Sequence, residues 1–221
     1  MAVHLHREIE VLKKKILMVG AIAESSVWDA SQALQNRDEK LAQQVIDKDI
    51  QLDNMEVEVE EACLKTLALY QPVAIDLRFI VAVLKINNDL ERVGDLAVNI
   101  AERALFIACH PPVDIGFDYM LMATKVQAML KQSLDALVRY DVDAARMVCA
   151  QDDEVDAMNS QMYARVQQAI HAQAEHTETL IHLLSAVRHL ERIADHATNI
   201  AEDVIYMTNG EIIRHKTEEY R

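Results

Sequence analysis

Two stretches of the chain, one hundred residues apart, carry the same polar side chains at the same spacing. Residues 90–102 read LERVGDLAVNIAE and residues 190–202 read LERIADHATNIAE, identical at nine of thirteen positions. Each copy holds a glutamate and an aspartate four residues apart, and these are Glu91 with Asp95 and Glu191 with Asp195. Residues at this spacing lie on one face of an α-helix. Their carboxylates repel by about 0.2–0.5 kcal/mol even when exposed, and a bound cation would relieve that repulsion.

A weaker repeat supplies more acids upstream of each copy. KDIQLDNM (48–55) resembles QDDEVDAM (151–158), and the matching aspartates are Asp49, Asp53, Asp152 and Asp156. The first row continues with Glu56 and Glu60, whereas the second has Asn159 and Tyr163 at those places. If the two helices of each repeat face each other along these rows, eight carboxylates form two all-oxygen cation sites. Oxygen donors favour hard or borderline cations such as Mg, Ca, Mn or Fe.

The alternative without a cation is that these acids form ordinary solvated helix faces, or that the repeat is kept for packing. The drift between the copies argues against it, because apolar Val93 became Ile193 while the acids stayed the same. The histidines His182, His189 and His196 either belong to the ordinary surface or add nitrogen ligands that let iron or zinc compete at the second site. Glu-x-x-His pairs typical of ferritin-like di-iron sites do not occur.

Arg92 and Arg192 follow the glutamates of the two copies. The simple role for Arg92 is a salt bridge to Asp89 or Asp95, which lie three residues away on the same helix. Anion binding is the alternative, although one arginine per site without a glycine-rich loop supports it weakly. Three scattered cysteines, Cys63, Cys109 and Cys149, form no CxxC motif and are expected to be buried, unpaired thiols.

Long helices must position these residues. The 221-residue chain contains only 4 Gly and 3 Pro, is 51% apolar and only 5% aromatic, which is typical of a helical bundle. Breaks at NRD (36–38), QP (71–72), HPPVDIG (110–116) and NG (209–210), with N-caps at Asp141 and Thr177, divide it. We predict an all-α protein with helices over 5–35, 38–70, 73–109, 116–139, 142–174 and 178–208. These form two tandem antiparallel three-helix bundles related by internal duplication.

The predicted domains are a first bundle (1–110), a second bundle (114–210) and a C-terminal tail (211–221). The net charge of −14 would repel a polyanion, so nucleic-acid binding is not expected. The N-terminal residues lack the apolar core of a signal peptide, and no apolar run is long enough to span a membrane. The sequence therefore predicts a cytoplasmic protein that meets a membrane only through its partners.

One segment carries a resemblance to a known family. LALYQPVAIDLRFIVAVLKINNDLERVGDLAVNIAERA (67–104) resembles the signature region of the PhoU family of phosphate-signalling regulators, and HLERIADHATNIAED (189–203) is similar to its second copy. The resemblance implies two three-helix bundles in tandem. It also implies multinuclear metal clusters held by E/D-x-x-x-D motifs, with iron expected and Mn, Mg or Zn as alternatives. Those motifs map to Glu91/Asp95 and Glu191/Asp195, with partners Asp49/Asp53 and Asp152/Asp156.

The same resemblance implies a non-enzymatic, homodimeric negative regulator of the phosphate-starvation response. It would couple the ATPase subunit of a phosphate ABC transporter to a phosphate-sensing histidine kinase and modulate phosphate uptake. Two other functions stay open on the residues alone. One is a metal-dependent hydrolase that uses the clustered carboxylates on a bound water, and the other is a metal-free structural module whose acids pair with arginines.

Overall fold

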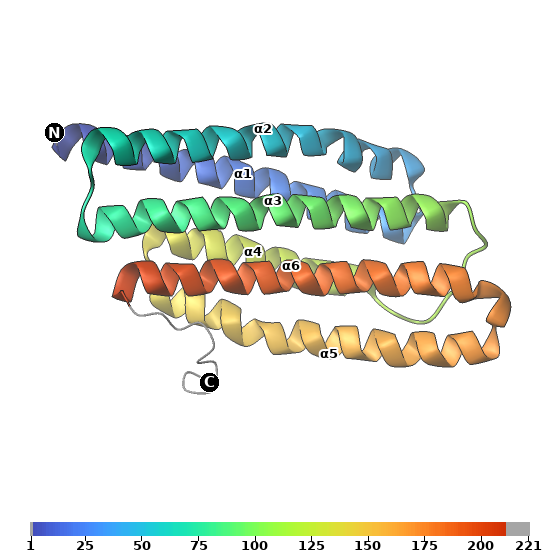
Figure 1. Cartoon of the computed structure of the whole chain (residues 1–221). Coiled ribbons are helices and arrows are strands. Elements are labelled where there is room, and N and C mark those ends of the chain that lie inside the picture. Colours follow the sequence, from blue (N-terminus) through green and yellow to red (C-terminus); the bar gives the residue numbers. More distant parts are fainter. Residues whose placement is uncertain (1, 211–221) are drawn as a thin grey trace.

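The computed structural model describes residues 2–210, so the predicted tail 211–221 lies outside the described residues. Within that range the secondary structure is helical, and the predicted all-α class with two three-helix units is confirmed. The first unit comprises α1 (Ala2–Asn36), α2 (Glu39–Tyr70) and α3 (Ala74–Ala108). The second comprises α4 (Tyr119–Arg139), α5 (Val142–Ala172), a 3-10 turn η1 (Ala174–His176) and α6 (Thr177–Asn209) (Figure 1).

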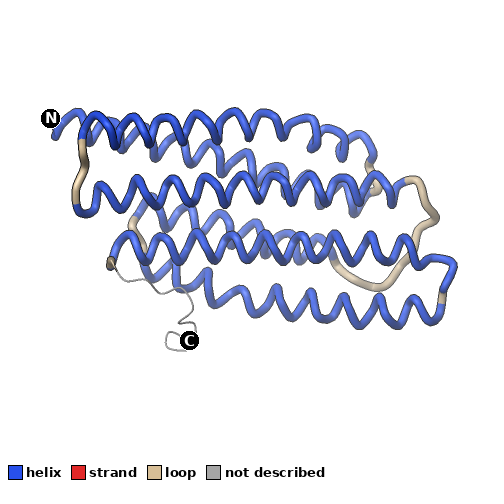
Figure 2. The backbone as a smooth tube through the Cα atoms, in the orientation of Figure 1, coloured by secondary structure: helices blue, strands red, loops and turns tan. Residues whose placement is uncertain are grey.

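Aspartate caps set three of the helix starts. Asp38, Asp118 and Asp141 each have extended backbone angles and accept hydrogen bonds from backbone N–H groups of the first turn that follows. Asp118 explains why α4 begins three residues later than predicted. The chain between α3 and α4 is the longest connection among residues 2–210 (Figure 2). The turn η1 was not predicted, and Thr177 is the first residue of α6 rather than its cap.

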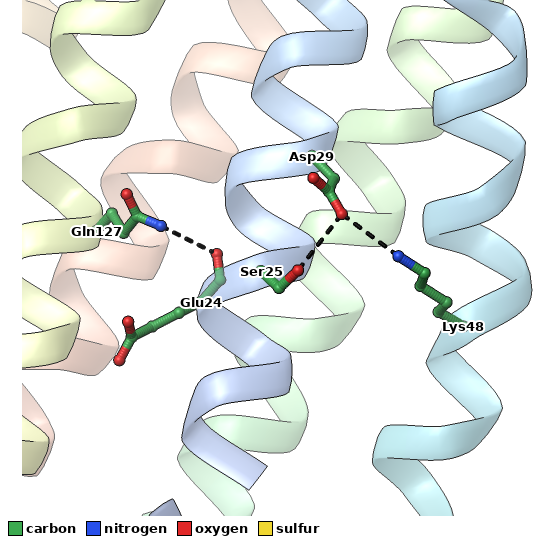
Figure 3. Close-up of polar contacts among 5 residues, drawn as sticks. All are labelled: Glu24, Ser25, Asp29, Lys48 and Gln127. Carbon is green, nitrogen blue, oxygen red and sulfur yellow. Dashed lines mark hydrogen bonds and ion pairs between the residues drawn. The ribbon is translucent and has the colours of Figure 1, made fainter. Parts of the chain in front are cut away.

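The two units pack against each other along two pairs of helices. Helix α3 lies beside α6 in the middle of the molecule, and α1 packs on α4 (Figure 1). Figure 3 shows α1 between its neighbours: Asp29 Oδ2 lies 3.5 Å from Lys48 Nζ of α2, and Gln127 of α4 donates to the Glu24 carbonyl at 3.5 Å. All six α-helices contribute to one buried apolar cluster. The repeats therefore form one packed body.

Polar and aromatic side chains recur along the contact between α3 and α6, which we call the α3–α6 seam. Its contacts, in order along the seam, are Arg78 Nε donating to the Met207 carbonyl at 2.8 Å, Lys85 Nζ 3.1 Å from Asp203 Oδ1, Asp89 Oδ1 2.8 Å from His196 Nδ1, and the Phe106 ring stacked on His182 at 3.6 Å. Asp203 is only 2% exposed. A buried charge that loses its partner is costly, so the pair of Lys85 and Asp203 favours this register of the two units.

None of the helices described over residues 2–210 combines the length and the apolar composition needed to span a membrane. The three cysteines are unpaired as predicted, Cys63 is buried, and Cys149 is only partly buried. The prediction of a buried thiol is wrong for Cys109, which is exposed because α3 ends at Ala108 and the chain then leaves the core.

Candidate functional site

The acids of the first repeat lie on facing helices. Asp49 and Asp53 belong to α2, and Glu91 and Asp95 belong to α3. The two helices approach closely at Gly94, where a side-chain methyl group in place of the glycine hydrogen would lie 3.1 Å from Asp49 Oδ1. The glycine therefore leaves space for the Asp49 carboxylate against the backbone of α3.

The carboxylates of the first repeat share one electrostatic environment, and we call them the first acidic cluster. Burial, followed by the charges of Asp53 and Asp95, raises the pKa of Asp49 to about 6. Burial also raises the pKa of Glu91, with Asp95, Asp53 and Glu56 adding to the effect. Asp49 and Glu91 hold their protons more tightly because burial disfavours the charged form and because their neighbours are negative. The structure thus brings together the four acids that the sequence singled out in this half.

The second repeat forms an equivalent second acidic cluster from α5 and α6. Burial, Asp156, Asp195 and Glu191 together raise the pKa of Asp152 to about 6. Burial and neighbouring acids also raise the pKa values of Glu191 and Asp195. One oxygen, Asp152 Oδ1, is buried and has no hydrogen-bond partner. A buried carboxylate oxygen without a donor is rare and calls for a proton, a water or a cation.

The two halves differ in the hydrogen bonding of Glu56 on α2 and of the equivalent residue on α5, Asn159. In the first half, Asn87 donates from Nδ2 to both the backbone carbonyl (2.9 Å) and Oε1 (3.0 Å) of Glu56. In the second half, Val187 replaces Asn87, and the buried Oδ1 of Asn159 has no partner. The role of Asn87 was missed from the sequence. Its signal is an amide at a core-facing position of the apolar stripe of α3, where it is 1% exposed.

The three histidines lie along the α3–α6 seam, which corrects the prediction of ordinary surface positions. His196 pairs with Asp89 across the seam, and His182 stacks on Phe106. His189 accepts or shares a hydrogen bond with the Ser185 hydroxyl at 3.3 Å, and burial with nearby arginines lowers its pKa to about 4. The observed contacts of His196 and His182 direct these rings toward α3.

Arg92 also differs from its simplest prediction. Its Nε donates to Asn88 Oδ1 at 2.9 Å, one turn earlier on α3. The predicted salt bridge to Asp89 or Asp95 is therefore replaced by a bond to an amide, and Asp89 is used by His196 instead.

Both clusters have the chemistry that suits a hard cation. Their donors are oxygens, burial and neighbouring negative charge raise the pKa values of Asp49 and Asp152 to about 6, and the second cluster contains a buried oxygen without a partner. The side-chain positions are not those of a ready-made centre: within residues 2–210, no three Asp, Glu, His or Cys side chains converge to metal-binding geometry. Cation binding by the eight acids therefore stays a prediction, and binding would require some of these side chains to move.

Comparison with known proteins gives consistent matches over both repeats. A family model described as the PhoU domain matches residues 16–104 and 119–204. The phosphate-specific transport system accessory protein PhoU homolog of Clostridium acetobutylicum is 36% identical, covering 92% of this chain and 93% of that protein. The homolog of Aquifex aeolicus is also 36% identical and covers 96% of both chains.

Solved structures agree in fold over almost the whole chain. The crystal structure of PhoU from Pseudomonas aeruginosa superposes with a TM-score of 0.88 at 35% identity, covering 93% of this chain and 99% of that one. The phosphate transport system regulatory protein PhoU from Streptococcus pneumoniae gives a TM-score of 0.84 at 26% identity, covering 94% and 98%.

Proposed function

Because this chain belongs to the PhoU family, we propose that it is a cytoplasmic, non-enzymatic regulator of phosphate transport that restrains the phosphate-starvation response. The observation that supports this function is similarity over 92–96% of the chain, including both repeats, to proteins named as accessory to a phosphate-specific transport system. Its proposed partners are a second copy of itself, the ATPase subunit of the phosphate ABC transporter and a phosphate-sensing histidine kinase. Contact with the membrane is through those partners.

The regulator is proposed to bind metal at both acidic clusters. Asp49, Asp53, Glu91 and Asp95 would hold the first group of ions. The second group would be held by the four corresponding acids Asp152, Asp156, Glu191 and Asp195. When bound, the ions would supply the positive charge that the repelling carboxylates lack. Iron is the proposed metal, with manganese, magnesium and zinc as alternatives.

Complementation tests the regulatory function. A bacterium lacking its own PhoU gene and carrying a reporter of a phosphate-starvation promoter is expected to express the reporter even in abundant phosphate. Expression of this chain should restore repression in abundant phosphate and allow induction when phosphate is withdrawn. A reporter that stays fully on, with the chain expressed and folded, would contradict the proposal.

Metal content tests the second part independently. Tag-free protein, purified without added metal, is analysed by mass spectrometry beside the Glu91→Ala/Asp95→Ala and Glu191→Ala/Asp195→Ala variants. Each variant is expected to lose the metal of its own cluster and keep that of the other. Absence of metal from every sample, even after dialysis against the candidate cations, would leave the acids as salt-bridge or docking residues. Turnover of a phosphoester substrate that requires both metal and these acids would favour a hydrolase instead.

A further inference from the structure

Helix α2 carries a row of large apolar side chains on its solvent face, which we call the α2 row. Ile50, Val57 and Leu64 are 67%, 50% and 53% exposed. They are seven residues apart, which is close to two helical turns, so they lie in one line along the helix. The side of α2 that faces the bundle is formed by other residues, and these buried residues include Leu52, Val59, Cys63 and Thr66.

The other half of the molecule lacks such a row. Aligning Asp49 with Asp152 places polar residues on α5 at the three equivalent positions, which are Asp153, Ser160 and Gln167. All three are exposed. The fold therefore does not require apolar residues at these positions. Single exposed apolar side chains are common on proteins, but a line of three on one helix indicates an interaction surface.

Negative charge borders the α2 row. Glu60 and Glu61 are exposed and lie one turn from Val57 and Leu64. Within residues 2–210, neither of these carboxylates forms an ion pair. The whole helix has eight acidic residues and three lysines. A partner surface that matches it must present apolar side chains next to positive charge.

We propose that the α2 row docks a basic amphipathic helix of a partner protein. Leucine-like side chains of that helix would pack along the row, and its lysines or arginines would meet the acids beside it. The row from Ile50 to Leu64 is about 21 Å long, which matches about four turns of a partner helix.

Charge argues against a second copy of this chain as the occupant. Two α2 helices lying row to row would bring the acids of one copy beside the acids of the other, and like charges across an interface cost affinity. The inference deepens the proposed function, because it assigns a surface and a partner chemistry to the regulator. It rests on that function only for the identity of the partner, and the docking chemistry can be measured without it.

The first arm of the test measures docking directly on the 221-residue chain. The probe is a fluorescent 21-residue helical peptide with leucines in a heptad pattern flanked by lysines, and binding is followed by anisotropy. We expect Ile50→Ser/Leu64→Ser to weaken binding at least about tenfold. Met147→Ser, which removes a similarly exposed side chain from α5, should change it less than about twofold. Circular dichroism melting checks that each variant is folded.

A charge variant separates apolar docking from general attraction to an acidic protein. Glu60→Gln/Glu61→Gln is expected to weaken peptide binding about three- to tenfold at low salt and to reduce its dependence on salt. Equal binding by the wild type, the row variant and the Met147→Ser control would overturn the proposal. It would also be overturned if the row variant lost self-association in sedimentation measurements but bound the peptide normally, because the row would then be a contact between copies.

The second arm uses the complementation reporter. The row variant, Ile50→Ser/Leu64→Ser, should fail to restore repression, whereas the Met147→Ser control should restore it. Full repression by the row variant would overturn docking at this surface in the cell. If the wild-type chain itself does not repress, the proposed function fails, and the peptide measurements still decide whether the α2 row takes a basic helix.

Discussion

Replacing Asp49 or Asp152 by asparagine is expected to stabilise the metal-free protein at pH 7 and to leave its stability nearly unchanged at pH 4. The pKa of each carboxyl group is raised from 3.8 to about 6 in the folded state. Below pH 3.8 the group is protonated whether the chain is folded or unfolded, so it has no effect. Above pH 6 it is ionised in both states, and the folded state carries the full unfavourable energy. The wild type therefore loses stability as the pH rises from about 4 to 6.

The magnitude follows from the size of the pKa change. A rise from 3.8 to about 6 corresponds to at most about 3 kcal/mol of lost stability per carboxyl group. Both groups are partly exposed, and solvent screening reduces this to about 1–1.5 kcal/mol each. Asparagine has nearly the same shape and no charge, so each variant should gain about that amount at pH 7 relative to pH 4.

Urea unfolding at pH 4, 5, 6 and 7 in the presence of a chelator measures this difference. His189 produces an opposite trend, because its pKa is lowered to about 4, so its contribution is present above pH 6.5 and lost as the pH falls through 4. Subtracting the wild-type curve from each variant curve removes that common trend. Asp47→Asn, at an exposed position of α2, is the comparison variant. A difference for Asp49→Asn and Asp152→Asn that stays flat from pH 4 to 7 would refute the reasoning.

Three further predictions concern packing and are measured by urea unfolding at pH 7. Gly20→Ala should lose up to about 2 kcal/mol, because the new methyl group would overlap Leu134 of α4 and this overpacking exceeds alanine's helix preference of about 1 kcal/mol. Arg37→Ala should lose about 1.5–3 kcal/mol, since its guanidinium donates to carbonyl groups at the end of α3. Phe106→Ala should lower the free energy of unfolding by about 2–3 kcal/mol, because it removes the ring that stacks on His182.

Matched variants check each reason. The loss caused by Gly20→Ala should disappear when it is measured in a Leu134→Ala background, and an unchanged loss would mean that the overlap is not its cause. Phe106→Leu should retain most of the stability if apolar burial dominates, whereas a loss equal to that of Phe106→Ala would assign the energy to stacking. For Arg37, a glutamine variant as stable as the wild type would show that the charge and the reach of the guanidinium are unnecessary.

The helices and their ends follow from local signals, whereas the packing of the two units does not. Periodic apolar residues and aspartate caps such as Asp141 act within a few residues of chain, so the sequence predicts them well. The α3–α6 seam joins residues 76 to 129 positions apart. Lys85 and Asp203 are both charged, and charge in a sequence ordinarily indicates a solvated surface. Only the packed structure shows that Asp203 is buried.

The candidate site is also only partly predictable from the sequence. The repeated acids stand out because duplication kept them while apolar residues drifted, and their meeting across two helices follows from their spacing. The partial burial of Asp49 does not, since it depends on how closely the helices approach at Gly94. The amide of Asn87 was hidden inside an apolar stripe, where a single polar residue gives no periodic pattern.

The ion pair between Lys85 and Asp203 has a consequence for the ancestry of the chain. In the hundred-residue repeat, Lys85 corresponds to Ser185 and Asp203 corresponds to Arg103. Two identical copies of the first half would therefore set Lys85 against Arg103, cation against cation. The two halves share a repeated sequence but differ at these contact positions, so each half matches the other half rather than a copy of itself, as the two subunits of an obligate heterodimer do. Because both halves belong to one chain, every molecule contains the two complementary surfaces in equal number.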